Sequence, residues 1–367
     1  MALSKIETAS LDVGQIGGRR NIIINGDMRI NQRQVGVTSI TGAADTMMVD
    51  RFACFAGTGA YNAEQSTDAP SGFSYSLKAT CTSVGTDDSE VWFQYKPEAQ
   101  DLAHLDYGSS DAKDFTLSFW VKSTTTGQAG IYFYQSDGNR AYQGRYTINS
   151  SNTWEYKSVT IPGDPSGLFN NDNGVGLEVR WYLAGKTGDS NTNVWGTNTQ
   201  NRSPSTWDVL STVGNVFAIT GVQMEVGDTA TPFEHRTYGE ELLLCQRYYE
   251  RIQDYNPQSQ DTSGSTSSEV LIGLGLALSS TRVLGRLDGW KVTKRVPPTV
   301  SISTNSQLQA IQTGAWYSAT NTPNFRANIF GARADFSHGG SFNAGGAVEL
   351  RFDTGAPDAY IEIDAEL

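Results

Sequence analysis

The sequence predicts an all-β fold class: a jelly-roll sandwich followed by one short helix and a second, smaller antiparallel β domain. Three observations support this prediction. Glycine accounts for 38 of the 367 residues and aromatic residues for 11%, while strong helix formers are sparse. Short segments of alternating apolar and polar residues recur between Gly, Asn, Asp and Ser clusters from about residue 45 to 235. Only one segment has a helical period.

The length suggests about two domains, since a domain commonly has about 150 residues. We divide the chain into a leader and hairpin at 1–44, a jelly-roll sandwich at 45–237, a helix and linker at 238–267, and a C-terminal β domain at 268–367. The linker is placed where Gln, Ser, Thr, Asp and Gly follow one another without a period.

The N-terminal segment has two parts. The first 20 residues show no sustained period, so we expect an extended leader that is ordered only by contact with a partner. The pair Asn25-Gly26 then separates two apolar runs and predicts a hairpin with a type I′ turn, because both residues tolerate positive φ.

The sandwich strands are predicted from alternation with period two. In residues 115–122 the apolar members that share one face are Phe115, Leu117, Phe119 and Val121. A second set that alternates in the same way is Leu177, Val179, Trp181 and Leu183. The long run from Val216 to Val226 contains Gly221 as an expected bulge. The Asn- and Ser-rich stretch between Gly185 and Trp207 is expected to be a surface loop.

The single predicted helix covers about Tyr238 to Gln253, with Thr237 as its cap and acids in its first turn. Its apolar stripe consists of Leu242, Cys245, Tyr249 and Ile252. A helix this short cannot bury such a stripe alone, so we predict that these four residues form an oligomer interface.

The C-terminal domain begins with a strand in which leucines and small residues alternate. Ile272, Leu274, Leu276 and Leu278 share one face, and Gly273, Gly275 and Ala277 share the other. The small face allows close approach of another backbone. The last segment sends Ile361, Ile363, Ala365 and Leu367 to one face, which is expected to point into the core.

Charge and hydropathy argue against several classes of partner and location. Lys and Arg number 27 against 39 Asp and Glu, a formal net charge of −12, so nucleic acid is a poor partner. Neither an apolar run of membrane-spanning length nor a secretory signal is found in the sequence, and membrane insertion is not expected. The three cysteines are far apart and are expected to be reduced and buried.

No motif for catalysis, metal or cofactor stands out. A phosphate-binding loop ending at Thr187 lacks the required glycine at Arg180, and the calcium-like run after Phe169 lacks the first ligand. The three histidines show no zinc-binding spacing. We therefore predict no catalytic or metal-binding residues and no cofactor, although a carboxylate pair for glycoside cleavage is neither located nor excluded.

Aromatic residues are more numerous than one core requires. They can stack on sugar rings or pack in the core or between subunits, and both alternatives remain open for each residue. The residues that we select as receptor-binding candidates are Trp316, Tyr317, His338, Phe342, Trp195 and Trp207. The first four belong to two C-terminal loops, and the last two to the loop ending at Trp207.

Several motifs together resemble phage tail fibre and related virion appendage proteins. The opening Asn21 to Arg33, followed by Asp50-Arg51-Phe52, is similar to the opening of that family, with Phe52 in place of a tryptophan. The segment from Gly221 to Tyr249 is very similar to the family's last jelly-roll strand and following helix. Residues 115–122 and 154–163 also match, so the resemblance covers about residues 20–250.

The resemblance implies a non-enzymatic fibre with a jelly roll of carbohydrate-binding-module type. It further implies a homotrimer, attached through its N-terminal part to another virion protein and assembled in the host cytoplasm. The leading hypothesis is a structural tail fibre that contributes to host attachment by binding a host-surface glycan. The alternatives are a polysaccharide depolymerase on the same scaffold and a purely structural head or tail decoration protein.

Overall fold

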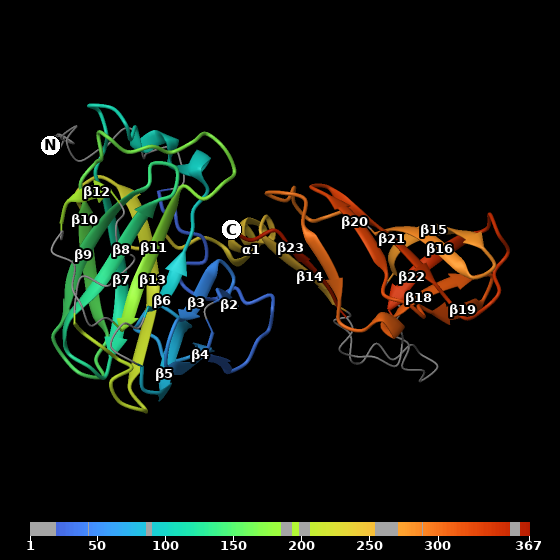
Figure 1. Ribbon diagram of the computed structural model, residues 1–367, viewed down its shortest axis with the longest axis horizontal. Helices are drawn as coiled ribbons and strands as arrows, with labels where there is room; N and C mark the ends of the chain where they lie inside the picture. Colours follow the sequence, from blue (N-terminus) through green and yellow to red (C-terminus); the bar gives the residue numbers. More distant parts are fainter. Residues whose placement is uncertain are drawn as a thin grey trace, which may run out of the picture. The chain divides into compact units, whose positions relative to one another are not determined.

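A computed structural model describes residues 20–42, 44–85, 90–184, 193–197, 206–253, 271–287, 289–352 and 360–367. The chain divides into two compact units between Glu241 and Leu242 (Figure 1). All sheet pairings of named strands are antiparallel, which confirms the predicted fold class. No helix within the described ranges is long and apolar enough to cross a membrane.

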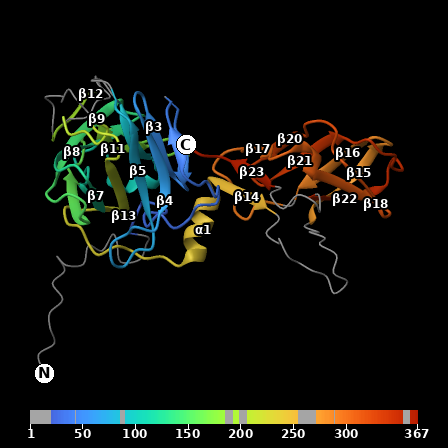
Figure 2. The same cartoon turned by 90° about the horizontal axis from the view of Figure 1, so that it is seen from below.

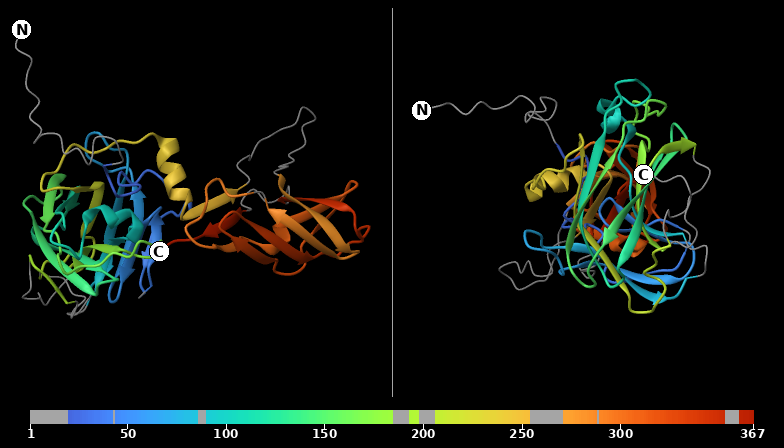
Figure 3. Two further views of the ribbon diagram at one scale, coloured as in Figure 1. Left: turned by 90° about the horizontal axis from the view of Figure 1, so that it is seen from above. Right: turned by 90° about the vertical axis from the view of Figure 1, so that its left-hand side faces the viewer.

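The first unit is a jelly-roll sandwich of two facing sheets, seen from two further directions in Figure 3. The first sheet has the order β1 (Thr38–Ile40), β4 (Ala60–Ser66), β5 (Ser76–Ser83), β13 (Val216–Val226), β7 (Phe115–Ser123), β10 (Glu155–Ile161). The second has the order β12 (Trp195–Thr197), β9 (Arg140–Ile148), β8 (Gly127–Gln135), β11 (Leu177–Ala184), β6 (Val91–Tyr95), β3 (Phe52–Ala56), β2 (Thr46–Val49). A 3-10 helix spans Ala99–Leu105.

The core of this unit lies between the two sheets and contains both predicted apolar rows. The four residues of the β7 row and the four of the β11 row are fully buried. Trp181 of β11 packs edge-on against Phe119 of β7, with ring centroids 5.8 Å apart at 88°. Aromatic pairs of this geometry add to the stabilisation that burial provides. The predicted bulge is confirmed, because the β13–β7 register shifts between Thr220 and Gln223, and Gly221 has φ of +61°.

The predicted hairpin at Asn21–Ile30 is wrong: these residues form a turn without strands. Asn25 has φ of +60°, but its side chain binds the backbone of Ile30 and the carbonyl of Asp50. Gly26 packs on the β13 bulge, where a Cβ would lie 2.0 Å from the carbonyl oxygen of Val222. Contacts with β13 therefore replace the expected pairing, and glycine is required for this close approach rather than for a type I′ turn.

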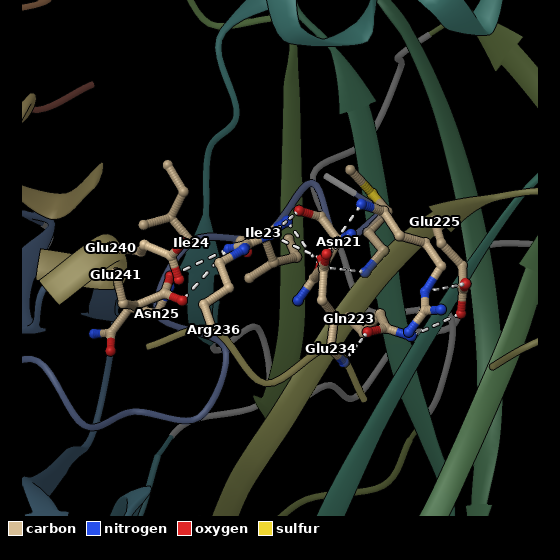
Figure 4. A network of polar contacts seen from close by, with 12 residues as sticks. Asn21, Ile23, Ile24, Asn25, Gln223, Glu225, Glu234, Arg236, Glu240 and Glu241 are labelled. Carbon is tan, nitrogen blue, oxygen red and sulfur yellow. Dashed lines mark hydrogen bonds and ion pairs between the residues drawn. The ribbon is translucent and has the colours of Figure 1, made fainter. Parts of the chain in front are cut away.

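This N-terminal turn is bound to the end of the same unit by buried polar contacts (Figure 4). Asn21 accepts a hydrogen bond from the Met224 amide and donates one to the carbonyl of Val222. The Arg236 guanidinium donates to the carbonyl of Ile23 at 3.1 Å and lies 3.3 Å from the Glu241 carboxylate. The four apolar residues Ile23, Ile24, Met28 and Ile30 are buried as well. Residues 20–30 therefore belong to the folded sandwich unit, whereas residues 1–19 of the expected leader lie outside the described ranges.

The predicted helix is shorter than expected. Helix α1 spans Tyr238–Gln246, and Thr237 caps it as predicted, in a reciprocal pair of hydrogen bonds with Glu240. Strand β14 (Tyr249–Gln253) follows at once and pairs with β23 (Tyr360–Asp364), more than 100 residues later. Long-range pairing thus overrides the helical period, so the prediction of helix beyond Gln246 is wrong.

The second unit contains two antiparallel sheets. The three-stranded sheet has the order β14, β23, β17 (Thr299–Ile302). The seven-stranded sheet has the order β19 (Ala315–Ser318), β18 (Leu308–Gln312), β22 (Ala347–Phe352), β15 (Leu271–Ser279), β16 (Arg282–Leu287), β21 (Gly331–Ser337), β20 (Asn324–Asn328) (Figure 2). A short 3-10 helix, Asn305–Gln307, comes directly before β18 in the chain. Ile361 and Ile363 of the small sheet share one core with the inner face of the large sheet, as predicted for the last strand.

Strand β15 places its leucines outward. Leu274, Leu276 and Leu278 are 59%, 51% and 46% exposed, while Ala277 is buried. Ile272 is separated from these leucines by a register shift against β22 and lies in the core. The seven-stranded sheet therefore has an inner face built on small and apolar residues and an outer face that carries an exposed leucine row.

Candidate binding surface

Three of the predicted receptor-binding residues form one aromatic cluster in the second unit. The ring of Tyr317 is stacked on His338 at 5.4 Å and 13°, and Phe342 lies 5.0 Å from Tyr317 and 4.3 Å from His338. His338 and Phe342 are buried. Burial lowers the pKa of His338, and its Nδ1 accepts a hydrogen bond from the Gly340 amide, as a neutral imidazole can. This cluster supports the loop that follows β21 and offers little surface to a ligand.

Trp316, next to this cluster in sequence, points to the other side of β19 and is 63% exposed. Alternation along the strand explains the difference, because Tyr317 packs against the core and its neighbour must face outward. Of the four C-terminal candidates, Trp316 is thus the residue with a freely accessible ring. Trp316 lies at one end of an exposed surface that the sequence pattern did not predict.

One cross-strand row runs from Trp316 over all seven strands of the large sheet. Residues directly opposite each other on neighbouring strands point to the same face of a sheet. The row, read from β19 to β20, is Trp316, Ile311, Glu349, Leu274, Arg286, Arg333, Arg326. At about 4.8 Å between strands, this row extends over about 29 Å. Its length suits a chain-like ligand better than a single small molecule.

The arginine end of this row borders a groove of about 660 Å³ on the outer face. Its lining includes the leucines Leu274 and Leu276, the exposed ring of Phe330, and the three arginines of the row. The volume falls in the range of about 300–1,000 Å³ that is common for ligand sites. The groove thus combines apolar surface with convergent hydrogen-bond donors.

A fourth arginine beside the groove is already paired. Arg282 binds the Asp335 carboxylate with Nε and Nη2, at 2.9 and 2.7 Å. This pair lowers the pKa of Asp335, chiefly through the Arg282 hydrogen bond and further through the charges of Arg333 and Arg326. Asp335 is therefore ionised at neutral pH, and its carboxylate is engaged by Arg282.

The two candidates in the first unit differ in their environments. Trp207 is buried, donates from Nε1 to the carbonyl of Thr125 at 3.2 Å, and packs against Phe217. The prediction that Trp207 is a receptor-binding residue is therefore not supported by its position, which is that of a core residue. Trp195 lies in β12, is half-buried, and contacts Tyr107 and Tyr142. Most of the expected loop, at 185–192 and 198–205, lies outside the described residues.

The outer face of the second jelly-roll sheet carries an aromatic and charged cluster that sequence reasoning missed. Trp92 stacks on Phe55 at 4.2 Å, and the Arg180 guanidinium lies over the Trp92 ring at 4.3 Å and over Tyr132 at 5.6 Å. The signal in the sequence was Arg180, a charged residue between the apolar residues Val179 and Trp181 of a predicted core strand. Trp92, Tyr132 and Arg180 are buried, and Phe55 and Tyr134 beside them are partly buried.

The four residues predicted as an oligomer interface do not form one exposed stripe. Cys245 and Tyr249 are buried, and Leu242 and Ile252 are half-buried. Tyr249 and Ile252 lie in β14, where an odd separation places them on opposite faces. The helical period ends at Gln246, so it does not align Tyr249 and Ile252 with the residues of the helix. Cys245 lies within the helix and is buried, and the interface stays a prediction for the four residues.

The titratable residues of the described ranges do not gather into a metal site. No group of three or more His, Cys, Asp or Glu side chains with suitable geometry occurs among them. The three cysteines are buried, as expected.

Comparisons with known proteins find similar solved structures. No family model matches the chain, and no curated protein matches it. It is similar to the enzymatically active domain of tailspike protein 4 from bacteriophage CBA120, at 20% identity and a TM-score of 0.30, over 56% of this chain and 21% of that one. It is also similar to a xylan-binding domain from Paenibacillus barcinonensis, at 10% identity and a TM-score of 0.27, over 58% of this chain and 99% of that one.

A family 11 carbohydrate-binding module from Clostridium thermocellum is similar at 15% identity and a TM-score of 0.25, over 54% of this chain and 100% of that module. The fold defines this chain as a jelly-roll sandwich joined to a second antiparallel β unit. Because the chain spans about a fifth of the tailspike it matches, and because identities are low, its function has to be inferred from its own residues.

Proposed function

We propose that the chain is a non-enzymatic virion appendage of the tail fibre type that contributes to host attachment by binding a surface glycan. The binding surface is the outer face of the seven-stranded sheet in the second unit. The observation that carries this proposal is the row from Trp316 to Arg326 with its adjoining groove, where exposed apolar side chains and hydrogen-bond donors lie on one face.

The chemistry of this face suits a polysaccharide. Sugar rings present apolar C–H faces and hydroxyl edges, so a site for them needs exposed aromatic or aliphatic surface beside polar groups. Trp316 and Phe330 are each 63% exposed. Phe330 and three arginines border the groove, whereas Trp316 lies at the other end of the row. A large contiguous patch of exposed apolar side chains on a folded protein commonly marks an interaction site or a ligand-binding groove.

The other parts of the chain have supporting roles in this proposal. The jelly roll is the scaffold that resembles the fibre family, and residues 1–19 bind another virion protein. The assembled fibre is a homotrimer in the virion. This arrangement leaves the second unit, far from the attachment point in sequence, as the part that meets the host surface.

The proposal is tested by measuring binding of the full chain to an array of bacterial lipopolysaccharides and capsular polysaccharides. We expect binding that Trp316→Ala weakens about tenfold, a typical cost for losing an aromatic contact at a binding site. The matched control is Tyr156→Ala, because Tyr156 is an exposed aromatic residue of β10 in the other unit. Absence of binding to every glycan would contradict the proposal.

The same samples separate binding from cleavage. If new reducing ends accumulate when the chain is incubated with a bound polysaccharide, the chain is a depolymerase and the non-enzymatic part of the proposal is wrong. If no glycan binds and the fibre still assembles on the particle, a purely structural decoration role is left.

A further inference from the structure

Three arginines lie side by side on three adjacent strands of the outer sheet face. Arg286 of β16 is directly opposite Arg333 of β21, and Arg333 is directly opposite Arg326 of β20. Their Cα positions extend over about 10 Å, since neighbouring strands are about 4.8 Å apart. Like charges placed directly opposite each other destabilise a sheet. Repulsion between the three guanidinium groups therefore makes the free energy of folding less favourable, and a bound anion would offset this repulsion.

The one described carboxylate whose pKa responds to the charges of Arg326 and Arg333 is Asp335, and it is shared with Arg282. No side-chain hydrogen bond or ion pair joins Arg286, Arg326 or Arg333 to another described residue. Arg282 binds both carboxylate oxygens of Asp335, which lies in the neighbouring row of the same face. In a chain with a net charge of −12, the row thus places three exposed arginines together while the carboxylate that interacts with two of them is bound to a fourth.

The groove beside these arginines is shaped for an inserted chain. The groove has a volume of about 660 Å³, and its lining consists of Leu274, Leu276, Phe330 and the arginines together with their neighbours. A protein interface of ordinary size needs a broad surface of about 800 Å² on each partner and no such hollow. The concave shape favours a narrow ligand, and the guanidinium groups favour a negatively charged one.

We infer that the arginine row binds an acidic polysaccharide through its carboxylate or sulfate groups. This inference rests on the proposed function and adds the chemical class of the glycan. Each guanidinium has a planar fork of N–H donors that matches a carboxylate or sulfate with two parallel hydrogen bonds. The leucines and Phe330 contact the apolar faces of the sugar rings, and the row neutralises successive charges along the ligand.

The test compares acidic and neutral probes with matched backbones. We would measure binding of the full chain to polygalacturonate and to its methyl ester, and to dextran sulfate and dextran. We expect the acidic member of at least one pair to bind, with the neutral member at least tenfold weaker, and we expect added salt to weaken the acidic complex. Polygalacturonate and dextran sulfate distinguish a carboxylate ligand from a sulfate ligand.

Substitutions locate the binding to the arginine row. Arg333→Gln should weaken acidic binding about tenfold or more, because it removes a bidentate charge-assisted contact. Arg333→Lys keeps the charge without the fork and should give an intermediate loss. The control is Arg145→Gln, which changes the net charge equally at an exposed residue of β9 in the other unit and should leave binding within about twofold.

The outcomes separate this inference from the proposed function. Binding of neutral glycans alone, unaffected by Arg333→Gln, would overturn the inference and leave the proposed function standing. No binding of any glycan would overturn both. If Arg333→Gln changes the molar mass of the assembly instead of ligand binding, the arginine row is a contact between copies of the chain, and the inference is wrong.

Discussion

The main-chain amide of Asn25 donates a hydrogen bond to Oε1 of Glu241 at 2.5 Å, although the two residues are 216 positions apart (Figure 4). Nη1 of Arg236 donates to the same carboxylate, at 3.3 Å from Oε1 and 3.5 Å from Oε2. The opening segment is therefore joined to the segment from Gly221 to Tyr249, the more specific of the two in its resemblance to fibre proteins. Asn25, Arg236 and Glu241 form a structural lock of the sandwich unit.

The first prediction concerns this lock. Glu241→Gln keeps the shape of the side chain but removes the charge that serves both the Asn25 amide and Arg236. Because the site is buried, we expect the free energy of unfolding of the first unit to fall by about 1–3 kcal/mol. Chemical denaturation followed by tryptophan fluorescence would measure it. Asp111→Asn, at an exposed acid of the same unit, should change the value by less than about 0.5 kcal/mol.

The second prediction concerns truncation. Deleting residues 1–33 removes Asn21 and Asn25 together with four buried apolar side chains, so we expect the first unit to lose its cooperative unfolding transition. Deleting residues 1–19 spares all these contacts and should preserve the transition, while the proposed role in virion attachment predicts loss of incorporation. If the variant that lacks residues 1–33 still unfolds cooperatively, these contacts are not needed for folding of the first unit. If the variant that lacks residues 1–19 is incorporated into virions normally, those residues are not the attachment segment.

Most of the sandwich could be predicted from local pattern. The alternation at Phe115–Val121 sufficed to identify a core strand, and a glycine in the long run at Val216–Val226 sufficed to identify a bulge. Local pattern failed where a distant segment decides the conformation. Strand β14 forms because β23 pairs with it, and the Asn25-Gly26 turn forms because Gly26 packs on Val222.

The candidate surface was predictable only in part for the same reason. Trp316 could be selected as an aromatic residue of a segment expected to be a loop, which forms strand β19 instead. The arginine row could not, because Arg286, Arg326 and Arg333 become neighbours only when the register of three strands is fixed. Register depends on pairing between segments and cannot be read from any one of them.

The third prediction concerns pH. Burial lowers the pKa of His338 below the ordinary histidine value of 6.5, so the unfolded chain binds the proton more readily than the folded unit. The stability contributed by neutral His338 is therefore fully present above pH 6.5 and decreases as pH falls below it. We expect the melting temperature of the second unit to fall between pH 7 and 5.

A His338→Gln variant provides the comparison for this prediction. Glutamine can accept the hydrogen bond from the Gly340 amide but does not titrate. The variant should show a smaller decrease over the same range, and the difference between the two curves isolates the contribution of His338. Parallel curves for the two proteins would show that His338 does not cause the decrease.

The fourth prediction concerns Tyr249. This side chain is buried in β14, and its hydroxyl donates to Oε1 of Glu362 at 2.7 Å. Tyr249→Phe should lower the free energy of unfolding of the second unit by about 1 kcal/mol, and Tyr249→Ser by about 3–5 kcal/mol, because the latter also leaves a cavity. Denaturation curves monitored on this unit would measure both. If Tyr249→Ser dissociates an assembly without destabilising the unit, Tyr249 belongs to an interface after all.

The last prediction separates ligand surface from subunit contact on the outer sheet face. Leu274 and Leu276 are exposed to an extent that is uncommon for neighbouring leucines on one strand, so either a ligand or a second copy covers them. The proposed homotrimer does not require this face, since the groove is assigned to a glycan. Leu274→Ser with Leu276→Ser should therefore leave the molar mass in solution unchanged, as measured by light scattering, and weaken binding of the acidic polysaccharide. A shift from trimer to monomer would instead assign the leucines to the contact between subunits, and it would leave the arginines at the rim of that contact rather than in a ligand groove.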